Sequence, residues 1–289
     1  MRLTKHILLL LAGIFLLITS CTEKQLTLDV MTYNIRNNNN PDADGSNFWP
    51  YRKDFAANMI RFYDVDIIGT QEVLVSQLND LLQALPGYNY IGVARDDGKE
   101  SGEFCALFFK EEKFELLEGN TYWLSEDPSA TGVKGWDANC VRVVTWAIFK
   151  DKSTGKKFAF FNTHLDHRGE VARVESAKLL VRKVDELSKG LPVIVTGDFN
   201  AVPGSEPVKI ITDQSRDNAL IDTRSLATLV YGPAWTAHDF GRTSMENRRI
   251  IDYVFVNDRV KVEKYAVIAE MLDSTYLSDH NPVLVTLGL

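Results

Sequence analysis

The feature that most constrains the fold of this chain lies in Val193–Ser205, VIVTGDFNAVPGS. It is a short apolar run that ends abruptly in polar and charged residues. Residues 193–195 predict a strand that is buried on both faces, and Gly197 allows the backbone to turn directly after it. Asp198 and Asn200 should therefore emerge at the carboxyl end of the strand. A carboxylate in this position is costly unless a metal, a cationic histidine or a nucleophilic water pairs with it. The simpler alternative is an Asx turn that closes the strand.

The same pattern recurs after four other apolar segments, and this recurrence favours a functional interpretation. Polar residues follow these segments in TYNIR, GTQE, NTHLDH and SDHNP, where the candidates are Asn34, Glu72, His164, Asp279 and His280. Open α/β sheets keep their chemistry at the carboxyl ends of their strands. We therefore expect these side chains to meet at one edge of the fold.

Strand and helix patterns alternate along the chain without an internal repeat or a linker rich in Pro, Gly or Ser. The expected strands are 26–35, 66–69, 88–93, 104–109, 114–123, 143–149, 158–162, 193–195, 250–256 and 282–287. The expected helices are 51–63, 74–85 and 168–188, with a short helix within 206–224. The charged, Gly-bearing segment 95–103 is expected to be a loop beside the site. A hydrophobic fraction of 45% suits one large core, so we expect a single α/β domain over 27–289.

The first residues are predicted to be an export signal, 1–20, rather than part of the fold. This segment has a basic start with Arg2 and Lys5, an apolar centre and the ending I-T-S-C. The apolar centre is too short to span a bilayer, although a short N-terminal anchor helix is the alternative. The ending resembles a bacterial lipobox, which implies cleavage before Cys21, lipidation of its thiol and a tether over 21–26. The protein is then expected in the bacterial cell envelope, lipid-anchored to a membrane.

Net charge lowers the expectation of a nucleic-acid partner. The chain has a formal charge of −7, which becomes −9 once residues 1–20 are removed. Proteins that bind long polyanions usually have a net positive charge, because contacts with phosphate groups supply most of the affinity. A local basic patch is compatible with this value, so a nuclease remains an alternative.

The types of residue at the strand ends favour a hard cation. Carboxylates and amides predominate there, and neither Cys105 nor Cys140 has neighbours that suggest a zinc cluster. Oxygen ligands favour Mg²⁺ or Mn²⁺ over zinc. The two cysteines either form a disulfide in an oxidising envelope or are separate, small buried residues.

Several candidates have a structural interpretation beside the functional one. Glu72 either caps the helix that follows it or binds a metal, and His164 is either a hydrogen-bonded structural residue or a functional one. Arg142 precedes an almost wholly apolar strand, where a guanidinium usually needs a partner such as a phosphate. His238 lies in a loop from which it could reach a ligand, and the irregular aromatic loop 125–139 is typical of substrate-facing segments.

Taken in order, the motifs N…E…H…D-x-N…D…D-H resemble the endonuclease/exonuclease/phosphatase superfamily, which includes pancreatic deoxyribonuclease, Mg²⁺-dependent sphingomyelinases and carbon-catabolite-repression type deadenylases. The resemblance runs from about Thr27 to the C-terminus, and SGEFCALFFK and loop 125–139 look closest to the deadenylase-like branch. It implies a four-layer α/β sandwich, in which two mixed sheets pack face to face with helices outside. The chain has no basic loop of the kind that duplex-DNA enzymes insert into a groove, which speaks against DNA cleavage.

The resemblance also implies the composition of a metal site. Glu72 in GTQEV looks like the principal ligand, with Asn34 in MTYNIR helping to place it. Asp279 in SDHNP looks like a further metal-site carboxylate. The implied cofactor is Mg²⁺ or Mn²⁺.

Catalytic and phosphate-binding roles follow from the same resemblance. Asp198 and Asn200 in GDFN look like the pair that orients the attacking water and holds a phosphoryl oxygen, and His280 looks like the catalytic imidazole, oriented by Asp252 in IDYVFV. His164 shares the catalytic site. The phosphate contacts implied are Arg142, His164 and Asn200, with Glu103 as a hydrogen-bond partner for His164.

These roles predict a divalent-metal-dependent hydrolase of a small phosphoester, nucleotide or lipid headgroup, above all a phosphodiester, acting by in-line attack of water. The first alternative is a nuclease that degrades extracellular RNA or DNA. The second is a lipid-anchored binding protein that keeps the fold without turnover. We expect a monomer whose partners are the phosphoester and, through the anchor, a membrane.

Overall fold

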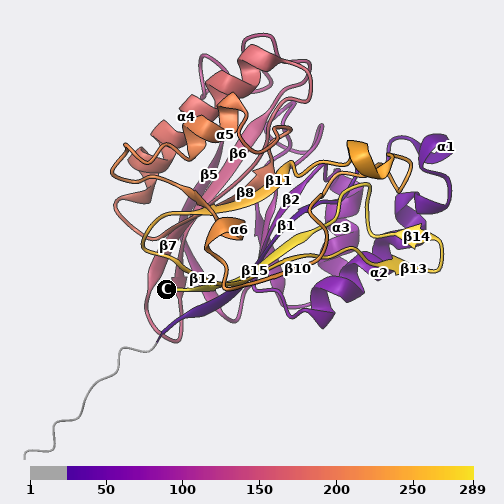
Figure 1. Cartoon of the computed structure of the whole chain (residues 1–289), viewed down its shortest axis with the longest axis horizontal. Coiled ribbons are helices and arrows are strands. Elements are labelled where there is room, and N and C mark those ends of the chain that lie inside the picture. Colours follow the sequence, from indigo (N-terminus) through magenta and orange to yellow (C-terminus); the bar gives the residue numbers. More distant parts are fainter. Residues whose placement is uncertain (1–24) are drawn as a thin grey trace, which may run out of the picture.

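The computed structural model describes residues 25–289, so the predicted export signal and Cys21 lie outside the described residues. Its centre is a pair of β-sheets (Figure 1). The first sheet has seven strands in the order β10 (Leu229–Tyr231), β12 (Lys261–Val267), β15 (Val283–Gly288), β1 (Thr27–Asn34), β2 (Ile67–Gln71), β4 (Leu107–Lys110) and β3 (Tyr88–Ile91). The second has six in the order β5 (Phe114–Trp123), β6 (Val143–Asp151), β7 (Lys157–His164), β8 (Val193–Asp198), β11 (Asp252–Val256) and β9 (Ile221–Asp222).

Helices cover the outer face of each sheet. The helices are α1 (Pro41–Asp44), α2 (Trp49–Phe62), α3 (Val75–Ala84), α4 (Glu170–Ser188), α5 (Glu206–Ile211) and α6 (Thr223–Leu226), with 3-10 turns η1 (Gly45–Asn47) and η2 (Met245–Asn247). Side chains of α2 and α3 form one core with the outer face of the seven-stranded sheet, and those of α4 and α5 form another with the six-stranded sheet. A small hairpin of β13 (Met271–Leu272) and β14 (Thr275–Tyr276) lies beside α2 (Figure 1). The predicted four-layer α/β sandwich is therefore confirmed.

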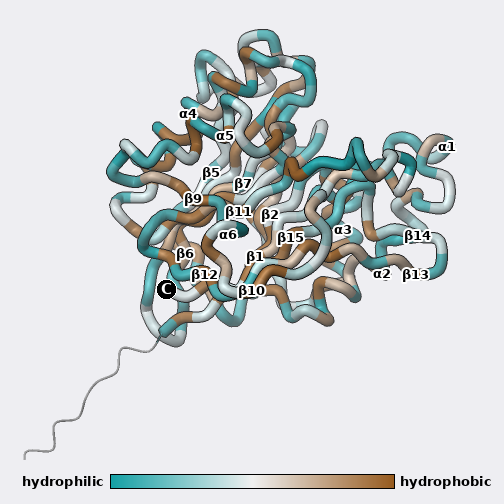
Figure 2. Tube along the Cα trace, in the orientation of Figure 1, coloured by the Kyte–Doolittle hydropathy of each residue, from teal (hydrophilic) through white to brown (hydrophobic). Residues whose placement is uncertain are grey.

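The first half of strand β8 shows why Val193–Val195 is apolar at every position. Ile194 lies in the core between the two sheets, whereas Val193 and Val195 point outward into the core beneath α4. Successive side chains of a strand alternate between its faces, so a strand that is covered on both sides is apolar throughout. Figure 2 shows the corresponding pattern for the chain, with hydrophilic colours mainly in the peripheral connections. The predicted strand buried on both faces is confirmed.

The two sheets approach each other closely below the polar strand ends. A Cβ added to Gly69 would lie 2.0 Å from Oγ1 of Thr196 on the facing sheet, so only glycine fits here. Gln71 Nε2 donates to Asn162 Oδ1 across the same gap at 2.7 Å. The apolar interior thus gives way to paired polar groups near this end of the sandwich, and buried polar groups need such partners.

Differences from the sequence expectations are local. β12 was not among the predicted strands, because a register shift between Val262 and Lys264 interrupts its alternation of apolar and polar residues. The strand expected over 104–109 begins later, at Leu107. Cys105 is buried, Cys140 is partly exposed and both thiols are free, so the disulfide alternative is not realised. Among the described residues, no helix is long and apolar enough to cross a bilayer.

Candidate active site

Strand register places three predicted site residues in one row of the six-stranded sheet. β7 is parallel to β8 with His164 opposite Asp198, and β11 is antiparallel to β8 with Asp252 opposite Asp198. Neighbouring strands lie roughly 5 Å apart, so side chains in such a row reach one another. The fold thereby assembles residues that lie far apart in the sequence.

The seven-stranded sheet contributes two more of the predicted residues at the same end of the sandwich. β1 and β2 are parallel with Asn34 opposite Gln71, so Glu72 follows directly beside Asn34. Asn34 then joins the two sheets, because its Nδ2 donates to Asp198 Oδ2 at 3.0 Å and to Glu72 Oε1 at 3.1 Å. One buried amide therefore fixes the distance between two carboxylates.

Glu72 occupies a strained and strongly hydrogen-bonded position. Its φ of 62° lies in the left-handed region, which a residue with a side chain adopts at a cost. Oε2 accepts from the backbone N and from Nδ2 of Asn37 at 3.1 and 2.9 Å. Burial opposes ionisation, but the charge of Arg36 and the hydrogen bonds from Asn34 and Asn37 hold the pKa of Glu72 below its ordinary value. The helix-capping interpretation is wrong, because Leu74 stands at the N-cap of α3.

Asp198 lies at the centre of the cluster. Its Oδ1 accepts from the backbone N of Asn200 at 2.9 Å, and its Oδ2 lies 3.4 Å from His164 Nε2 and 3.7 Å from His280 Nδ1. Asn200 also has a left-handed backbone, with φ of 46°. Burial and the negative charge of Asp252 raise the pKa of Asp198 to about 7. Asn34 and Asn200 therefore fix the Asp198 carboxyl group beside the two histidines.

His280 is held by the carboxylate of Asp252, which lies 2.9 Å (Oδ2) and 3.2 Å (Oδ1) from its Nδ1. Burial disfavours the imidazolium, but the charges of Asp252 and Asp198 raise the pKa of His280 well above its ordinary value. Because Nδ1 donates to Asp252, the second N–H of the imidazolium is left for the cleft. Burial raises the pKa of the adjacent Asp279, and Arg36 Nη1 lies 3.6 Å from its Oδ2.

His164 differs from His280 in charge. Burial and the positive charges of Arg142 and Arg95 hold the pKa of His164 well below its ordinary value, so the ring is neutral. Its Nε2 lies 3.0 Å from Asn200 Nδ2. The expected partnership with Glu103 is wrong: within the described part of the chain the buried Nδ1 of His164 has no hydrogen-bond partner, and the carboxylate of Glu103 accepts from Arg95 Nη1 instead. A charged guanidinium is a stronger donor than a neutral imidazole.

These residues surround one cleft with a volume of about 310 Å³. What we call the acidic half contains the carboxylates and the groups beside them: Arg36, Asn37, Glu72, Asp198, Asp279 and His280. What we call the arginine half contains Arg95, Glu103, Cys140, Arg142 and His167. His164 and Asn200 line the cleft as well. Asn34 and Asp252 lie behind this surface and support it.

The ligand types present fit a hard divalent cation. Asp198, Asp252 and His280 offer atoms that all lie within 4.8 Å of one another. However, Nδ1 of His280 already donates to Asp252, so the oxygens of Glu72 and Asp279 are the better candidates on the cleft side. Carboxylate oxygens are the ligands that Mg²⁺ and Mn²⁺ prefer.

Part of the cleft wall consists of residues that were not predicted from the sequence. Arg36, Asn37, Cys140 and His167 line the cleft but were not singled out. Arg36 and His167 stand within three residues of the predicted Asn34 and His164, so proximity along the chain was the available signal. Arg95 comes from the segment 95–103, which was expected only as a loop beside the site.

His238 was a candidate ligand-binding residue, and the structure does not bring it into the cleft. It is 1% exposed, and its Nδ1 accepts from the backbone N of Gly241 at 3.0 Å. The backbone N of His238 donates to the carbonyl oxygen of Asp279 at 3.0 Å. His238 therefore packs behind the acidic half and holds the chain there.

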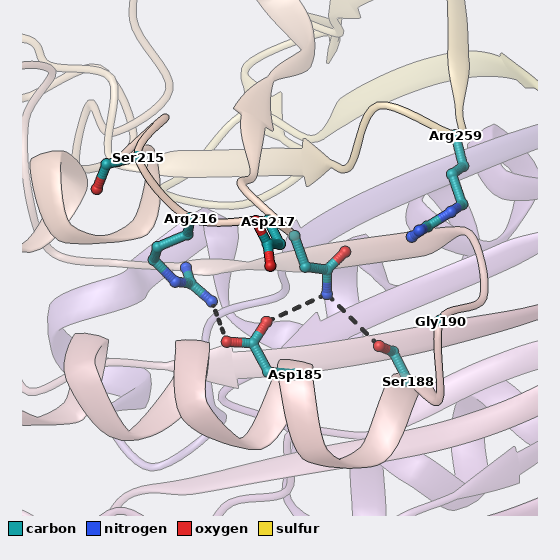
Figure 3. Close-up of a pocket in the computed structure, with 8 residues that line it drawn as sticks. Asp185, Ser188, Gly190, Ser215, Arg216, Asp217 and Arg259 are labelled. Carbon is teal, nitrogen blue, oxygen red and sulfur yellow. Dashed lines mark hydrogen bonds and ion pairs between the residues drawn. The ribbon is translucent and has the colours of Figure 1, made fainter.

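A larger hollow of about 570 Å³ lies elsewhere, at the C-terminal part of α4 (Figure 3). There Arg216 Nη2 donates to Asp185 Oδ2 at 2.7 Å, and Asn218 Nδ2 lies 3.3 Å from Asp185 Oδ1. Its lining includes neither a histidine nor any of the predicted site residues. Size alone therefore does not identify the functional site, whereas the grouped carboxylates and imidazoles do.

The sandwich and its cleft define a protein with the DNase I-like fold. The profile described as "Endonuclease/Exonuclease/phosphatase family" matches residues 31–280, and the chain belongs to this family. A Bacteroides vulgatus structure of the same family is 45% identical, with a TM-score of 0.87 over 91% of this chain and 98% of that one. A mannosyl-6-phosphatase of Bacteroides thetaiotaomicron is 40% identical, with a TM-score of 0.82 over 90% of this chain and 99% of that one. Phosphoester hydrolysis is the chemistry of this family.

The deadenylase-like proteins are more distant relatives. Carbon catabolite repressor protein 4 homolog 5 of Arabidopsis thaliana is 26% identical over 62% of this chain, and the chain spans only 41% of its length. The two Bacteroides proteins exceed it in both identity and coverage. The predicted family is thus confirmed, whereas the expectation that the deadenylase-like branch is nearest is wrong.

Proposed function

We propose that this protein hydrolyses small phosphate esters, with a divalent cation, by in-line attack of water. The observation that carries the proposal is the convergence of Glu72, Asp198, Asp279, His280 and Asn200 on one cleft. Glu72 and Asp279 would hold the cation, with Asn34 fixing the position of Glu72. Such a cation stabilises negative charge on the phosphoryl group and the leaving oxygen.

The chain's own residues supply positioning and proton transfer. Asp198, whose Oδ2 is held by Asn34, orients the attacking water and accepts its proton. Asn200 and neutral His164 face the phosphoryl oxygens. Protonated His280, oriented by Asp252, donates its free N–H to the phosphoryl group or leaving oxygen.

The substrate that we propose is a small phosphate monoester such as a sugar phosphate. A volume of about 310 Å³ suits a small molecule and leaves little room for an oligonucleotide. The 40% identity to a mannosyl-6-phosphatase, over 90% of this chain, supports a sugar leaving group. This preference replaces the phosphodiester favoured by the sequence motifs.

A substrate screen tests the proposal. Residues 21–289 would be assayed with Mg²⁺ and Mn²⁺ against mannose 6-phosphate, other sugar phosphates, bis-p-nitrophenyl phosphate and oligonucleotides. We expect metal-dependent release of phosphate from sugar phosphates, with little effect of added salt. Turnover confined to oligonucleotides, falling steeply with salt, would instead support the nuclease. Affinity without hydrolysis of any ester would support the non-catalytic binding protein.

Envelope localisation by a lipid anchor is a separate proposal, based on the lipobox-like I-T-S-C before residue 22. Metabolic labelling with palmitate should mark the protein, and the Cys21→Ala variant should lose both the label and its membrane association. A wild-type protein that takes up no label would refute the anchor without affecting the hydrolase proposal.

A further inference from the structure

Two guanidinium groups meet in the arginine half of the cleft and share one carboxylate. Arg95 Nη1 donates to Glu103 Oε2, and Arg142 Nη1 lies 4.0 Å from the same oxygen. Arg142 Nε lies 3.7 Å from Asp166 Oδ2, but the oxygens of Asp166 already accept from the backbone N of Cys140 and of Gly169. The arginine half therefore has more donors than acceptors.

The surplus donors are buried. Arg142 has 5% of its side chain exposed, and within residues 25–289 its Nε and Nη1 have no hydrogen-bond partner. Arg95 is 15% exposed, and its Nε lies 3.8 Å from Asp96 Oδ1 but likewise has no hydrogen-bond partner there. The remaining contact of Arg142 is between Nη2 and His167 Nδ1 at 3.2 Å, and burial and the charge of Arg142 lower the pKa of His167. Buried N–H groups of a guanidinium that make no hydrogen bond are costly, so a ligand with several anionic oxygens fits this position.

The backbone of Arg95 is held by its neighbours, and its guanidinium is held by Glu103. Its carbonyl oxygen accepts from Trp123 Nε1 at 2.7 Å, and its backbone N donates to the carbonyl of Glu103 at 3.1 Å. Gly132 packs so tightly against this loop that an added Cβ would lie 2.4 Å from the carbonyl oxygen of Asp96. Loop 125–139 therefore supports the loop that carries Arg95, and preorganised donors bind at a lower entropic cost.

We infer that Arg95 acts with Arg142 as a pair that binds the terminal oxygens of a phosphate monoester and selects this dianion over a diester. This inference rests on the proposed function, because it assigns the substrate class of the same cleft. A monoester presents three terminal oxygens and a second negative charge, which two guanidiniums can bind together. A diester has one terminal oxygen fewer and a single charge, so it gains less from the second arginine.

Two variants of Arg95 test the inference by comparing esters on the same protein. For Arg95→Gln we expect kcat/KM for p-nitrophenyl phosphate to fall by about 10–100-fold, the range for a lost hydrogen bond to a charged group. The value for bis-p-nitrophenyl phosphate should change less than about threefold, because it makes fewer contacts with Arg95. Arg95→Lys, which keeps the charge, should fall between wild type and Arg95→Gln. Arg259→Gln, an exposed arginine at the hollow of Figure 3, is the charge-matched control and should leave both values unchanged.

Calorimetry with inorganic phosphate in metal-free buffer provides a second readout. Wild type should bind phosphate, and Arg95→Gln should bind it at least about tenfold more weakly. Equal losses on both esters, or unchanged phosphate affinity, would overturn the inference while leaving the hydrolase proposal intact. Loss of phosphate binding in a protein that hydrolyses no ester would instead refute the proposed function and support the subsite.

Discussion

The two halves of the cleft differ in how the fold positions them. In the acidic half, Glu72 and Asp198 lie at or directly after strand ends, and Asn34 joins their carboxylates across the two sheets. In the arginine half, Arg95 and Glu103 lie on one loop that a second loop supports. Strands hold reacting groups rigidly, whereas loops vary more readily. We therefore propose that the acidic half carries the reaction and the arginine half selects the substrate.

The strongest test of this division of roles is to remove the imidazole of His280 from the acidic half. His280→Ala should lower kcat by about 10²–10⁴-fold on every ester, the usual contribution of a general acid or base. Circular dichroism and thermal unfolding should show that the variant remains folded. Near-full turnover by folded His280→Ala on any good substrate would place the reaction elsewhere.

The carboxylate that orients His280 should have a smaller effect. Asp252→Asn should lower kcat by about 10–100-fold, as is common for residues that position a functional group. It should also change the pH–rate profile. The charge of Asp252 helps to raise the pKa of His280, so the protonated imidazole persists to higher pH in wild type. The basic limb should therefore shift to lower pH in Asp252→Asn, and an unshifted limb would show that His280 is not the group that titrates.

The arginine half should respond mainly in substrate affinity. Arg142→Lys keeps the charge but loses the planar fork that binds two oxygens, so KM for a monoester should rise by about tenfold with a smaller change in kcat. Steady-state kinetics over a range of substrate concentrations separates the two parameters. If kcat fell as steeply as in His280→Ala, the proposed division of roles between the halves would be wrong.

His238 packs behind the acidic half, and replacing it should change the pH dependence of stability rather than activity. Burial and the charge of His280 lower the pKa of His238 to about 4, below the ordinary value of 6.5. The unfolded chain binds a proton at His238 more readily than the folded chain does. The free energy of unfolding therefore falls as the pH drops from about 6.5 to about 4. The loss is roughly 3 kcal/mol across that window. Denaturant unfolding at several pH values should show a shallower acid-side loss in His238→Gln, and an unchanged slope would exclude His238 as its source.

The acidic half could be predicted from the sequence because its residues end apolar strands. Val193–Val195 identifies β8, and Asp198 follows at a fixed position, so the motif and the geometry agree. The arginine half lacked such a signal, because Arg95 lies in a charged loop in which any residue looks solvent-exposed. Glu103 was paired with the wrong residue for the same reason: sequence alone did not show that Arg95 would reach its carboxylate first.

The central claim is that residues from both sheets converge to hold a hard dication beside a phosphate ester. Calorimetric titration with Mn²⁺ and Mg²⁺, on wild type and on Glu72→Gln, tests it most directly, with Arg259→Gln as the control. We expect saturable binding of both ions by wild type and by the control, and a loss of at least about tenfold in affinity for Glu72→Gln. Absence of binding to wild type, or equal binding to Glu72→Gln, would contradict it.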